Sequence, residues 1–247
     1  MPDRSSYDPI AGMYDSFWAD WYLPAALPAL ETLFFSRVPP ASHVLDVCCG
    51  SGHVTRELVS RGYQVTGVDL SSELISIARE RLPAQEFLVQ DARCLKLARH
   101  VDAALSTFDS LNHMLTLSDL RDTFASVRNA LTPGGLFVFD MNVEEAYFAE
   151  WRQWTAFVES SSVGLVRGKY EATSRSARTE LIWFLKRNGR NEWERRDTVV
   201  EQQCYSEAEI TAALAQAGFS GIAATPAYEA GVTAELGVGR TFFSALA

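Results

Sequence analysis

An apolar run that ends in two closely spaced glycines constrains this chain more than any other feature. Residues 44–47 have the composition of a buried strand, Cys48-Cys49-Gly50-Ser51-Gly52 follows, and a helix is expected to begin at about His53. Glycine has no Cβ, so the backbone of such a turn can approach a ligand closely. Asp69 closes a second apolar run nineteen residues after Gly50. A carboxylate at the tip of the neighbouring parallel strand can accept hydrogen bonds from both ribose hydroxyls, so the two features predict a nucleoside pocket.

The turn departs from the pattern that binds dinucleotides. That fingerprint places a third Gly or Ala three residues after Gly52, where this chain has Thr55. Asp46 belongs to the turn, and no Lys or Arg lies between residues 44 and 55 to complement a pyrophosphate. These residues favour a cofactor without phosphates, and particularly one that carries a positive charge.

Length and composition indicate a globular enzyme with one sizeable core. The chain has 247 residues, of which 47% are hydrophobic and 21% charged. No apolar run reaches the length of a membrane span, and the first residues lack the apolar core of a secretory signal, so we expect a cytoplasmic protein. The net charge of −9 disfavours nucleic acid as a partner and leaves a small molecule as the expected substrate. The four cysteines lack the spacing of zinc ligands, so we expect reduced thiols and no metal.

Strand-length apolar runs alternate with helical patterns between residues 43 and 140. One helix is expected to begin at the N-cap Ser71 and to stop at Pro83, and another to end at Pro133-Gly134-Gly135. This alternation predicts an α/β fold with a doubly wound, mostly parallel sheet that binds its ligand at the carboxyl ends of the strands. The predicted strands are His43–Val47, Gln64–Asp69, Glu86–Gln90, Val101–Thr107 and Leu136–Asp140.

A different pattern predicts an inserted antiparallel sheet over residues 151–200, between core segments 1–150 and 201–247. Asn188-Gly189 has the composition of a two-residue hairpin turn, which would place Phe184 opposite Trp193. Residues 152–196 contain ten Lys or Arg against five Glu and no Asp. This excess fits either solvated strand faces or a preference for an acidic group of the substrate. Beyond the insertion, a capping box at Ser206–Glu209 predicts a helix, and two strands follow at Ile222–Ala227 and Thr241–Leu246.

Several of these motifs resemble those of class I S-adenosylmethionine-dependent methyltransferases, over about residues 7–140 and 205–247. The first motif of that family is an acidic residue followed by Gly-x-Gly-x-Gly; here Cys48 replaces the first glycine, as in small bacterial members. Leu131–Leu136 is similar to the loop before the fifth strand of the family. Thr107–His113 is similar to its fourth motif, which lines the methyl-transfer end of the pocket. The resemblance implies a seven-stranded Rossmann-like sheet whose last strand is antiparallel.

The resemblance also implies S-adenosylmethionine as the cofactor and assigns residues to it. Gly50 and Gly52 would admit its amino-acid part, Asp69 would hold the ribose, and Asp91 would accept a hydrogen bond from the adenine amine. Tyr14 lies in the segment that is similar to the one folding over the cofactor in small members. The complete expected set is Tyr14, Asp46, Cys48, Gly50, Ser51, Gly52, Asp69, Leu70, Asp91, Ala92, Thr107 and Phe108.

We therefore expect methyl transfer to a nitrogen or oxygen of a small molecule beneath the inserted sheet, which would act as a lid. In-line displacement depends on positioning and on exclusion of water, and the candidate catalytic residues are Tyr14, Asp109 and His113. Asp109 or His113 would act as a base, and the face of Tyr14 would stabilise the cation. A non-catalytic cofactor-binding module that acts through a protein partner is the alternative. A nicotinamide-dependent oxidoreductase is disfavoured by Thr55 and by Pro133-Gly134-Gly135. The identity of the substrate and the oligomeric state, a homodimer included, stay open.

Overall fold

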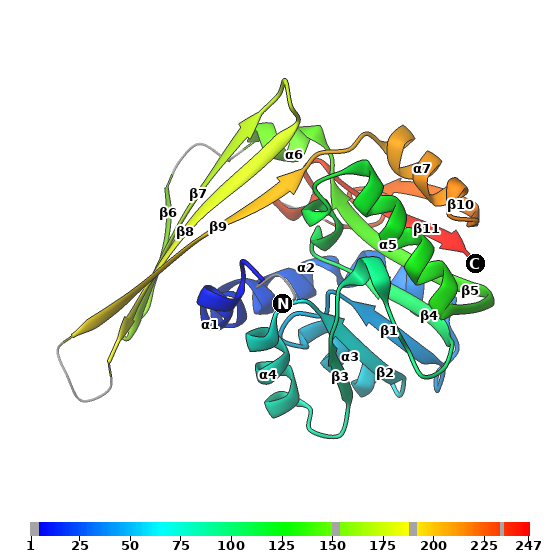
Figure 1. The fold of residues 1–247 in the computed structure, drawn as a ribbon, viewed down its shortest axis with the longest axis horizontal. Helices are drawn as coiled ribbons and strands as arrows, with labels where there is room; N and C mark the ends of the chain where they lie inside the picture. The colour runs from blue at the N-terminus through cyan, green and yellow to red at the C-terminus, as the bar shows by residue number, and fades with distance from the viewer. Residues whose placement is uncertain (1–4, 150–153, 188–191, 233–234) are drawn as a thin grey trace.

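A computed structural model describes residues 5–149, 154–187, 192–232 and 235–247. Figure 1 shows a sheet covered by helices and a second sheet that extends from it as a long twisted ribbon. The first sheet has seven strands in the order β10-β11-β5-β4-β1-β2-β3, and the second has four in the order β6-β7-β8-β9. Among these residues, no helix combines the length and the apolar character needed to cross a membrane.

The seven-stranded sheet confirms the predicted fold class. Strands β1 to β5 pair with one another in parallel, and β11 runs antiparallel to both β5 and β10. Leu131 already pairs with Val101, so β5 begins earlier than predicted, and the register shift that follows takes up Pro133-Gly134-Gly135. The strands are β1 (His43–Val47), β2 (Gln64–Asp69), β3 (Glu86–Val89), β4 (Val101–Ser106), β5 (Leu131–Asn142), β10 (Ser220–Pro226) and β11 (Arg240–Leu246).

Helices cover both faces of this sheet, because alternate side chains of each strand point to opposite sides. On one face, α5 (Leu117–Ala130) and α7 (Glu207–Gln216) pack against a core that includes Phe137 and Phe243. On the other face, α2 (Asp20–Leu30) and α3 (His53–Ser60) pack against Val138 and Phe242. The predicted caps are present: Ser71 caps α4 (Ser72–Arg81), and a capping box opens α7. The shorter helices are α1 (Ala11–Met13) and α6 (Glu144–Ala149).

The second sheet confirms the predicted antiparallel insertion but not its register. Its strands are β6 (Thr155–Val158), β7 (Ser162–Glu171), β8 (Ser176–Lys186) and β9 (Trp193–Gln203). The predicted pairing of Phe184 with Trp193 is wrong, because Trp193 lies opposite Lys186 and Phe184 opposite Arg195. The amide of Arg187 donates to the carbonyl of Glu192 at 2.9 Å, so the connection is longer than two residues. The predicted turn at Asn188-Gly189 lies outside the described residues, and the division into domains stays a prediction.

The N-terminal segment, residues 5–19, lies between the two sheets (Figure 1). Its apolar side chains Ile10 and Met13 pack with Trp183 and Val200 of the four-stranded sheet. Its carboxylates bind the core instead. Asp8 accepts a hydrogen bond from the hydroxyl of Ser71 at 2.6 Å, and Asp15 lies 2.8 Å from His53 and 2.7 Å from Arg81. The segment is therefore held by polar contacts on one side and by apolar contacts on the other.

Candidate active site

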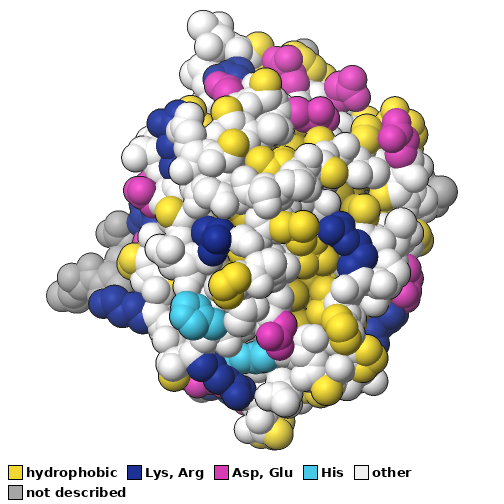
Figure 2. Space-filling model, turned by 90° about the vertical axis from the view of Figure 1, so that its right-hand side faces the viewer, with side chains coloured by type: hydrophobic (Ala, Val, Ile, Leu, Met, Phe, Trp, Pro, Cys, Tyr) yellow, Lys and Arg dark blue, Asp and Glu magenta, His cyan; other side chains and the backbone are white. Residues whose placement is uncertain are grey.

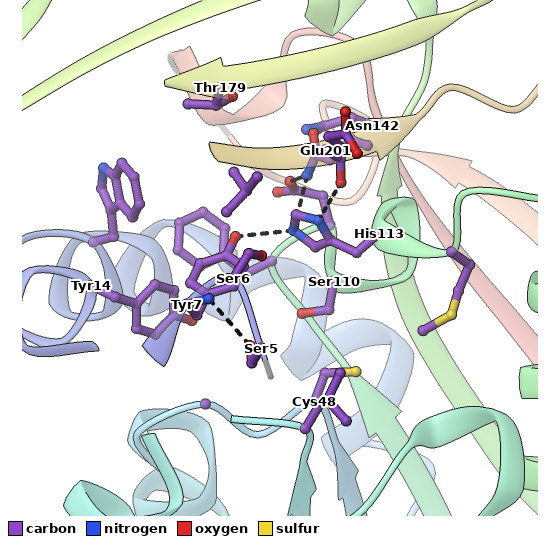
Figure 3. A pocket seen from close by; sticks show the side chains of 18 of the residues that line it. Ser5, Ser6, Tyr7, Tyr14, Cys48, Ser110, His113, Asn142, Thr179 and Glu201 are labelled. Atoms are coloured by element: carbon purple, nitrogen blue, oxygen red, sulfur yellow. Dashed lines mark hydrogen bonds between the residues drawn. The ribbon is translucent and has the colours of Figure 1, made fainter. Parts of the chain in front are cut away.

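A cavity of about 930 Å³ lies at the carboxyl ends of the parallel strands, beneath the four-stranded sheet. Gly50 and Asp69 line one end of it, and His113 lines the other. In Figure 3, Tyr7 reaches toward His113 from the N-terminal segment, while Cys48 lies below and Thr179 of β8 above. One continuous space therefore joins the predicted nucleoside pocket to the predicted catalytic residues.

The glycine turn and Asp69 form one hydrogen-bonded unit. Cys48, Gly50 and Gly52 have φ values of 58°, 54° and 81°, a left-handed conformation that side chains rarely adopt. A Cβ on Gly50 would lie 3.1 Å from the ring of Tyr14, which closes the space above the turn. One oxygen of Asp69 accepts from the amide of Gly50 at 2.9 Å, and the other from the amide of Ser71 at 2.8 Å. Each carboxylate oxygen retains a lone pair, so Asp69 can still accept from a ligand.

Asp46 lies beneath the turn rather than in the large cavity. Its carboxyl is fully buried and accepts a hydrogen bond of 2.6 Å from the hydroxyl of Thr55. Burial raises the pKa of Asp46 to about 7, although the hydrogen bond from Thr55 opposes this shift. Thr55, whose place in the sequence disfavours a dinucleotide, is therefore also the hydrogen-bond partner of Asp46.

Asp91 lies at the end of β3 and is held by a guanidinium. Its carboxylate accepts from the amide of Arg93 at 2.9 Å and pairs with the side chain of Arg93 at 2.6 Å. Arg93 lowers the pKa of Asp91, so this carboxylate is ionised at neutral pH. The same guanidinium lies 2.7 Å from Asp119.

The predicted cofactor-binding residues are distributed over two spaces. Those that line the large cavity are Tyr14, Cys48, Gly50, Asp69, Leu70, Asp91 and Phe108. A small space of about 20 Å³ behind the turn is lined by Asp46, Ser51 and Thr107, with Tyr14, Cys48 and Phe108 shared between the two. Gly52 and Ala92 line neither space.

The chain adopts a strained conformation directly after β4. Phe108 and Asp109 have φ values of 63° and 47°, and such conformations of non-glycine residues cost about 1–3 kcal/mol each. Two contacts hold them in place: the ring of Phe108 stacks on Tyr22 at a centroid distance of 4.4 Å, and the amide of Asp109 donates to Asp140 at 3.2 Å. The strain directs the side chain of Asp109 into the cavity that it lines.

A buried guanidinium joins Asp109 to the sheet. Arg240, at the start of β11, is only 6% exposed; it donates to Asp109 at 2.8 Å and also to Asp140. Burial disfavours the charge on Arg240, but the carboxylates of Asp140 and Asp109 outweigh it and raise its pKa. The hydroxyl of Tyr22 donates to the other oxygen of Asp140 at 3.0 Å. Together, the charges of Arg240, Asp109 and Asp140 add up to one net negative charge at this side of the cavity.

His113 lines the cavity and carries a ring nitrogen, Nε2, that acts as a hydrogen-bond acceptor. Its Nδ1 lies 2.7 Å from the carbonyl oxygen of Glu201, which can only accept, so Nδ1 carries the proton and Nε2 is the acceptor. The hydroxyl of Tyr7 lies 3.0 Å from Nε2, and the side-chain amide of Gln202 lies 3.5 Å away. Burial lowers the pKa of His113, so the imidazole is neutral at neutral pH. The arrangement can take up a proton at one defined atom.

Sequence reasoning missed Tyr7, Gln202 and Arg240. A single charge at the beginning of the apolar run 241–246 is a signal that Arg240 has a buried partner. Tyr7 and Gln202 gave no comparable signal, because their roles depend on how the N-terminal segment and β9 lie over the core.

Comparisons with known proteins identify the family. Residues 44–135 match a family described as "Methyltransferase domain". A putative methyltransferase of Geobacillus sp. strain WCH70, GWCH70_2453, is 31% identical over 187 residues, which are 73% of this chain and 74% of that protein. The chain belongs to the class I S-adenosylmethionine-dependent methyltransferases. This membership confirms the predicted family and its cofactor, S-adenosylmethionine.

Other relatives of this methyltransferase match over shorter stretches. The putative methyltransferase YqeM of Bacillus subtilis is 35% identical over 111 residues, 43% of this chain and 45% of its own length. The dTDP-3-amino-3,4,6-trideoxy-alpha-D-glucopyranose N,N-dimethyltransferase of Streptomyces venezuelae is 33% identical over 142 residues, 57% of this chain and 58% of that protein. A crystal structure of an S-adenosylmethionine-dependent methyltransferase from Clostridium acetobutylicum has the same fold. It superposes with a TM-score of 0.74 and 21% identity, over 98% of this chain and 99% of that one.

Proposed function

We propose that this methyltransferase transfers a methyl group from S-adenosylmethionine to a nitrogen or oxygen of a small molecule bound beneath the four-stranded sheet. The observation that carries this proposal is the single cavity that reaches from Gly50 and Asp69 to Nε2 of His113. Two relatives support the proposal, because one is named as an N,N-dimethyltransferase of an amino sugar and the other as an O-methyltransferase of ubiquinone biosynthesis.

The residues at the glycine turn fit the cofactor. Gly50, without a Cβ, leaves room for the ring of Tyr14 that closes this end of the cavity. The free lone pairs of Asp69 would hold the ribose hydroxyls, and Asp91 would accept from the adenine amine. The carboxylates of Asp69 and Asp91 also suit a ligand with a positive charge. When bound, S-adenosylmethionine supplies a methyl group on a cationic sulfur.

His113 is the base that the geometry favours over Asp109. Asp109 forms an ion pair with the buried guanidinium of Arg240 at 2.8 Å and accepts a hydrogen bond from Gln202 at 2.6 Å, so a proton taken up by Asp109 would cost it that ion pair. We therefore assign Asp109 as a positioning residue that holds Gln202 and faces His113 with a negative charge. Nε2 of His113 would accept the proton of the acceptor, after the acceptor displaces the hydroxyl of Tyr7. The ring of Tyr14, beside Gly50, would face the cationic methyl donor.

Methyl transfer is tested with the purified chain, cofactor labelled in the methyl group, and a metabolite extract. We expect heat on titration with S-adenosylmethionine and label in small molecules, and His113→Ala should lose at least tenfold in turnover with unchanged cofactor affinity. His100→Ala, at an exposed position, is the matched control. Cofactor binding without transfer of label to any acceptor would instead favour the non-catalytic module.

We also propose the four-stranded sheet as the lid of the substrate site. Thr179 lines the cavity, whereas the preceding residue, Arg178, is exposed and does not. We expect Thr179→Trp to fill the acceptor space, abolish transfer and leave the affinity for S-adenosylmethionine unchanged. Arg178→Trp is the control on the opposite face of the strand. Full turnover by Thr179→Trp would contradict the role of the sheet.

A further inference from the structure

We propose that the methyl acceptor is an amine nitrogen, on a molecule that carries no phosphate or carboxylate near that amine. The inference rests on the proposed function and narrows its substrate class. It depends on the charges that line the cavity and on how each is paired.

Carboxylates dominate the lining of the cavity. Among the described residues, the guanidinium groups that line it are Arg93 and Arg240, and each lies between two carboxylates. The lining residues that contribute these carboxylates are Asp69, Asp91, Asp109 and Asp119. Glu201 faces His113 with its backbone carbonyl, and its exposed side chain lies on the face of the sheet that carries Arg178. Because each guanidinium lies between two carboxylates, each of these groups of three charges is negative overall. The cavity therefore attracts cations and repels anions.

The acceptor end of the cavity carries the same bias. Its other polar groups, the imidazole of His113, the hydroxyl of Tyr7 and the amide of Gln202, are neutral. Arg240 is covered by Asp109 and Asp140, so a phosphate placed here would meet the carboxylate of Asp109. A protonated amine would be attracted by the same carboxylate.

The protons and electrons of the reaction balance on these residues. The ammonium of the substrate gives one proton to Nε2 of His113, forming an imidazolium that faces the negative charge of Asp109. The freed nitrogen lone pair then forms the new N–C bond as the C–S bond of the cofactor breaks, and sulfur keeps the electron pair as a neutral thioether. The positive charge passes to the methylated ammonium, which the acidic cavity still accommodates.

The basic residues of the sheet do not supply an anion site. Arg167, Lys169 and Arg178 line an adjoining hollow of about 760 Å³, which shares four lining residues, Glu201 and Gln202 among them, with the large cavity. Three carboxylates offset these three cations: Glu180 lies 2.5 Å from Arg167 and 3.6 Å from Lys169, and Glu171 and Glu201 line the hollow. Figure 2 shows the side of the molecule away from this sheet, where charges of both signs lie among apolar side chains. The excess of basic residues in 152–196 is therefore a property of solvated strand faces.

This conclusion separates the chain from its relative in Streptomyces venezuelae, which by name acts on a dTDP-linked amino sugar. A diphosphate carries at least two negative charges and needs cationic or amide donors around it. We expect this methyltransferase to bind dTDP no more tightly than thymidine.

The first experiment compares ligands that differ only in charge. Calorimetry on the protein saturated with S-adenosylhomocysteine uses dTDP against thymidine, and D-glucosamine 6-phosphate against D-glucosamine. We expect no gain in affinity from either phosphate. Binding of a phosphate-bearing probe tenfold tighter than its partner overturns the inference and leaves methyl transfer untouched.

The second experiment uses the product labelled from a metabolite extract and separated from unreacted cofactor. At pH 7 we expect it to be retained by a cation exchanger and to keep its label in mild alkali, as an N-methyl amine does. Retention by an anion exchanger, or release of label as methanol from an ester, overturns the inference but not the proposed function. Absence of any labelled product overturns both.

Discussion

Replacing the buried Arg240 by methionine should destabilise this protein far more than the same replacement of a surface arginine that also lies between two aspartates. The variant leaves the carboxylates of Asp109 and Asp140 without the guanidinium between them. Arg240 is 6% exposed, and breaking a buried pair by removing one partner costs about 3–5 kcal/mol. Domains of this kind are stable by about 5–15 kcal/mol, so the loss is a large share of the total.

Arg93 provides the matched control, because it too lies between two aspartates. Its side chain is 41% exposed, and solvent screens its pairs with Asp91 and Asp119. We expect Arg93→Met to cost less than about 1 kcal/mol. Unfolding in urea, followed by tryptophan fluorescence, measures both variants against the unmodified chain.

The cost of Arg240→Met should also depend on pH. Burial raises the pKa of Asp140 and Arg240 opposes this, so removing Arg240 raises that pKa further. A carboxyl whose pKa is higher in the folded state stabilises the fold while protonated and loses that contribution as pH rises through the folded value. The deficit should therefore be greatest at pH 8 and shrink toward pH 5. A deficit equal to that of Arg93→Met, or independent of pH, would refute the assignment of a buried charge cluster.

The remaining predictions concern the turn and the N-terminal segment. Burial raises the pKa of Asp46 to about 7, so the protein loses stability as pH rises through 7 and the buried carboxyl ionises. Asp46→Asn removes this charge and should therefore stabilise the protein at pH 8, and less at pH 5, as measured by unfolding in urea. Asp69→Asn should lower the affinity for S-adenosylmethionine at least tenfold, as measured by calorimetry, because hydrogen bonds to charged groups contribute about 1.5–3 kcal/mol. An unchanged affinity would exclude Asp69 from the cofactor site. Gly12→Ala should lower the unfolding midpoint, since the new Cβ would lie 2.5 Å from Trp183, and Trp183→Phe in the same chain should restore it.

The sequence predicted those features that local chemistry decides. The glycine turn and Asp69 were recognisable because a ligand-facing turn and the end of a buried strand each have their own composition. The helix caps at Ser71 and Ser206 depend on residues three positions apart, and the structure contains both. The alternation of strands and helices then left few topologies for the sheet.

Long-range pairing was beyond sequence reasoning. Asp140 and Arg240 lie on β5 and β11, Asp109 lies in the loop after β4, and their contacts exist only because β11 inserts antiparallel beside β5. The pairing of Phe184 was wrong by two residues because the hairpin closes through Arg187 and Glu192, and an Asn-Gly pair alone does not fix the loop length. A shift of two leaves each side chain on its own face, so the sheet formed as predicted.

The N-terminal segment contacts the glycine turn, His113 and the four-stranded sheet, and so connects these three parts of the site. Tyr14 lies above Gly50, Tyr7 lies against Nε2 of His113, and Gly12 lies against Trp183 of the four-stranded sheet. Displacing the segment at one of these points therefore disturbs the others, because only a few residues separate them. Gly12→Ala moves the contact with the four-stranded sheet and leaves the groups at the other two contacts chemically unchanged. If the segment acts as one unit, this variant should weaken cofactor binding as well as stability, and Trp183→Phe should restore both. Loss of stability with unchanged cofactor affinity would show that the contact with the four-stranded sheet is independent of the turn.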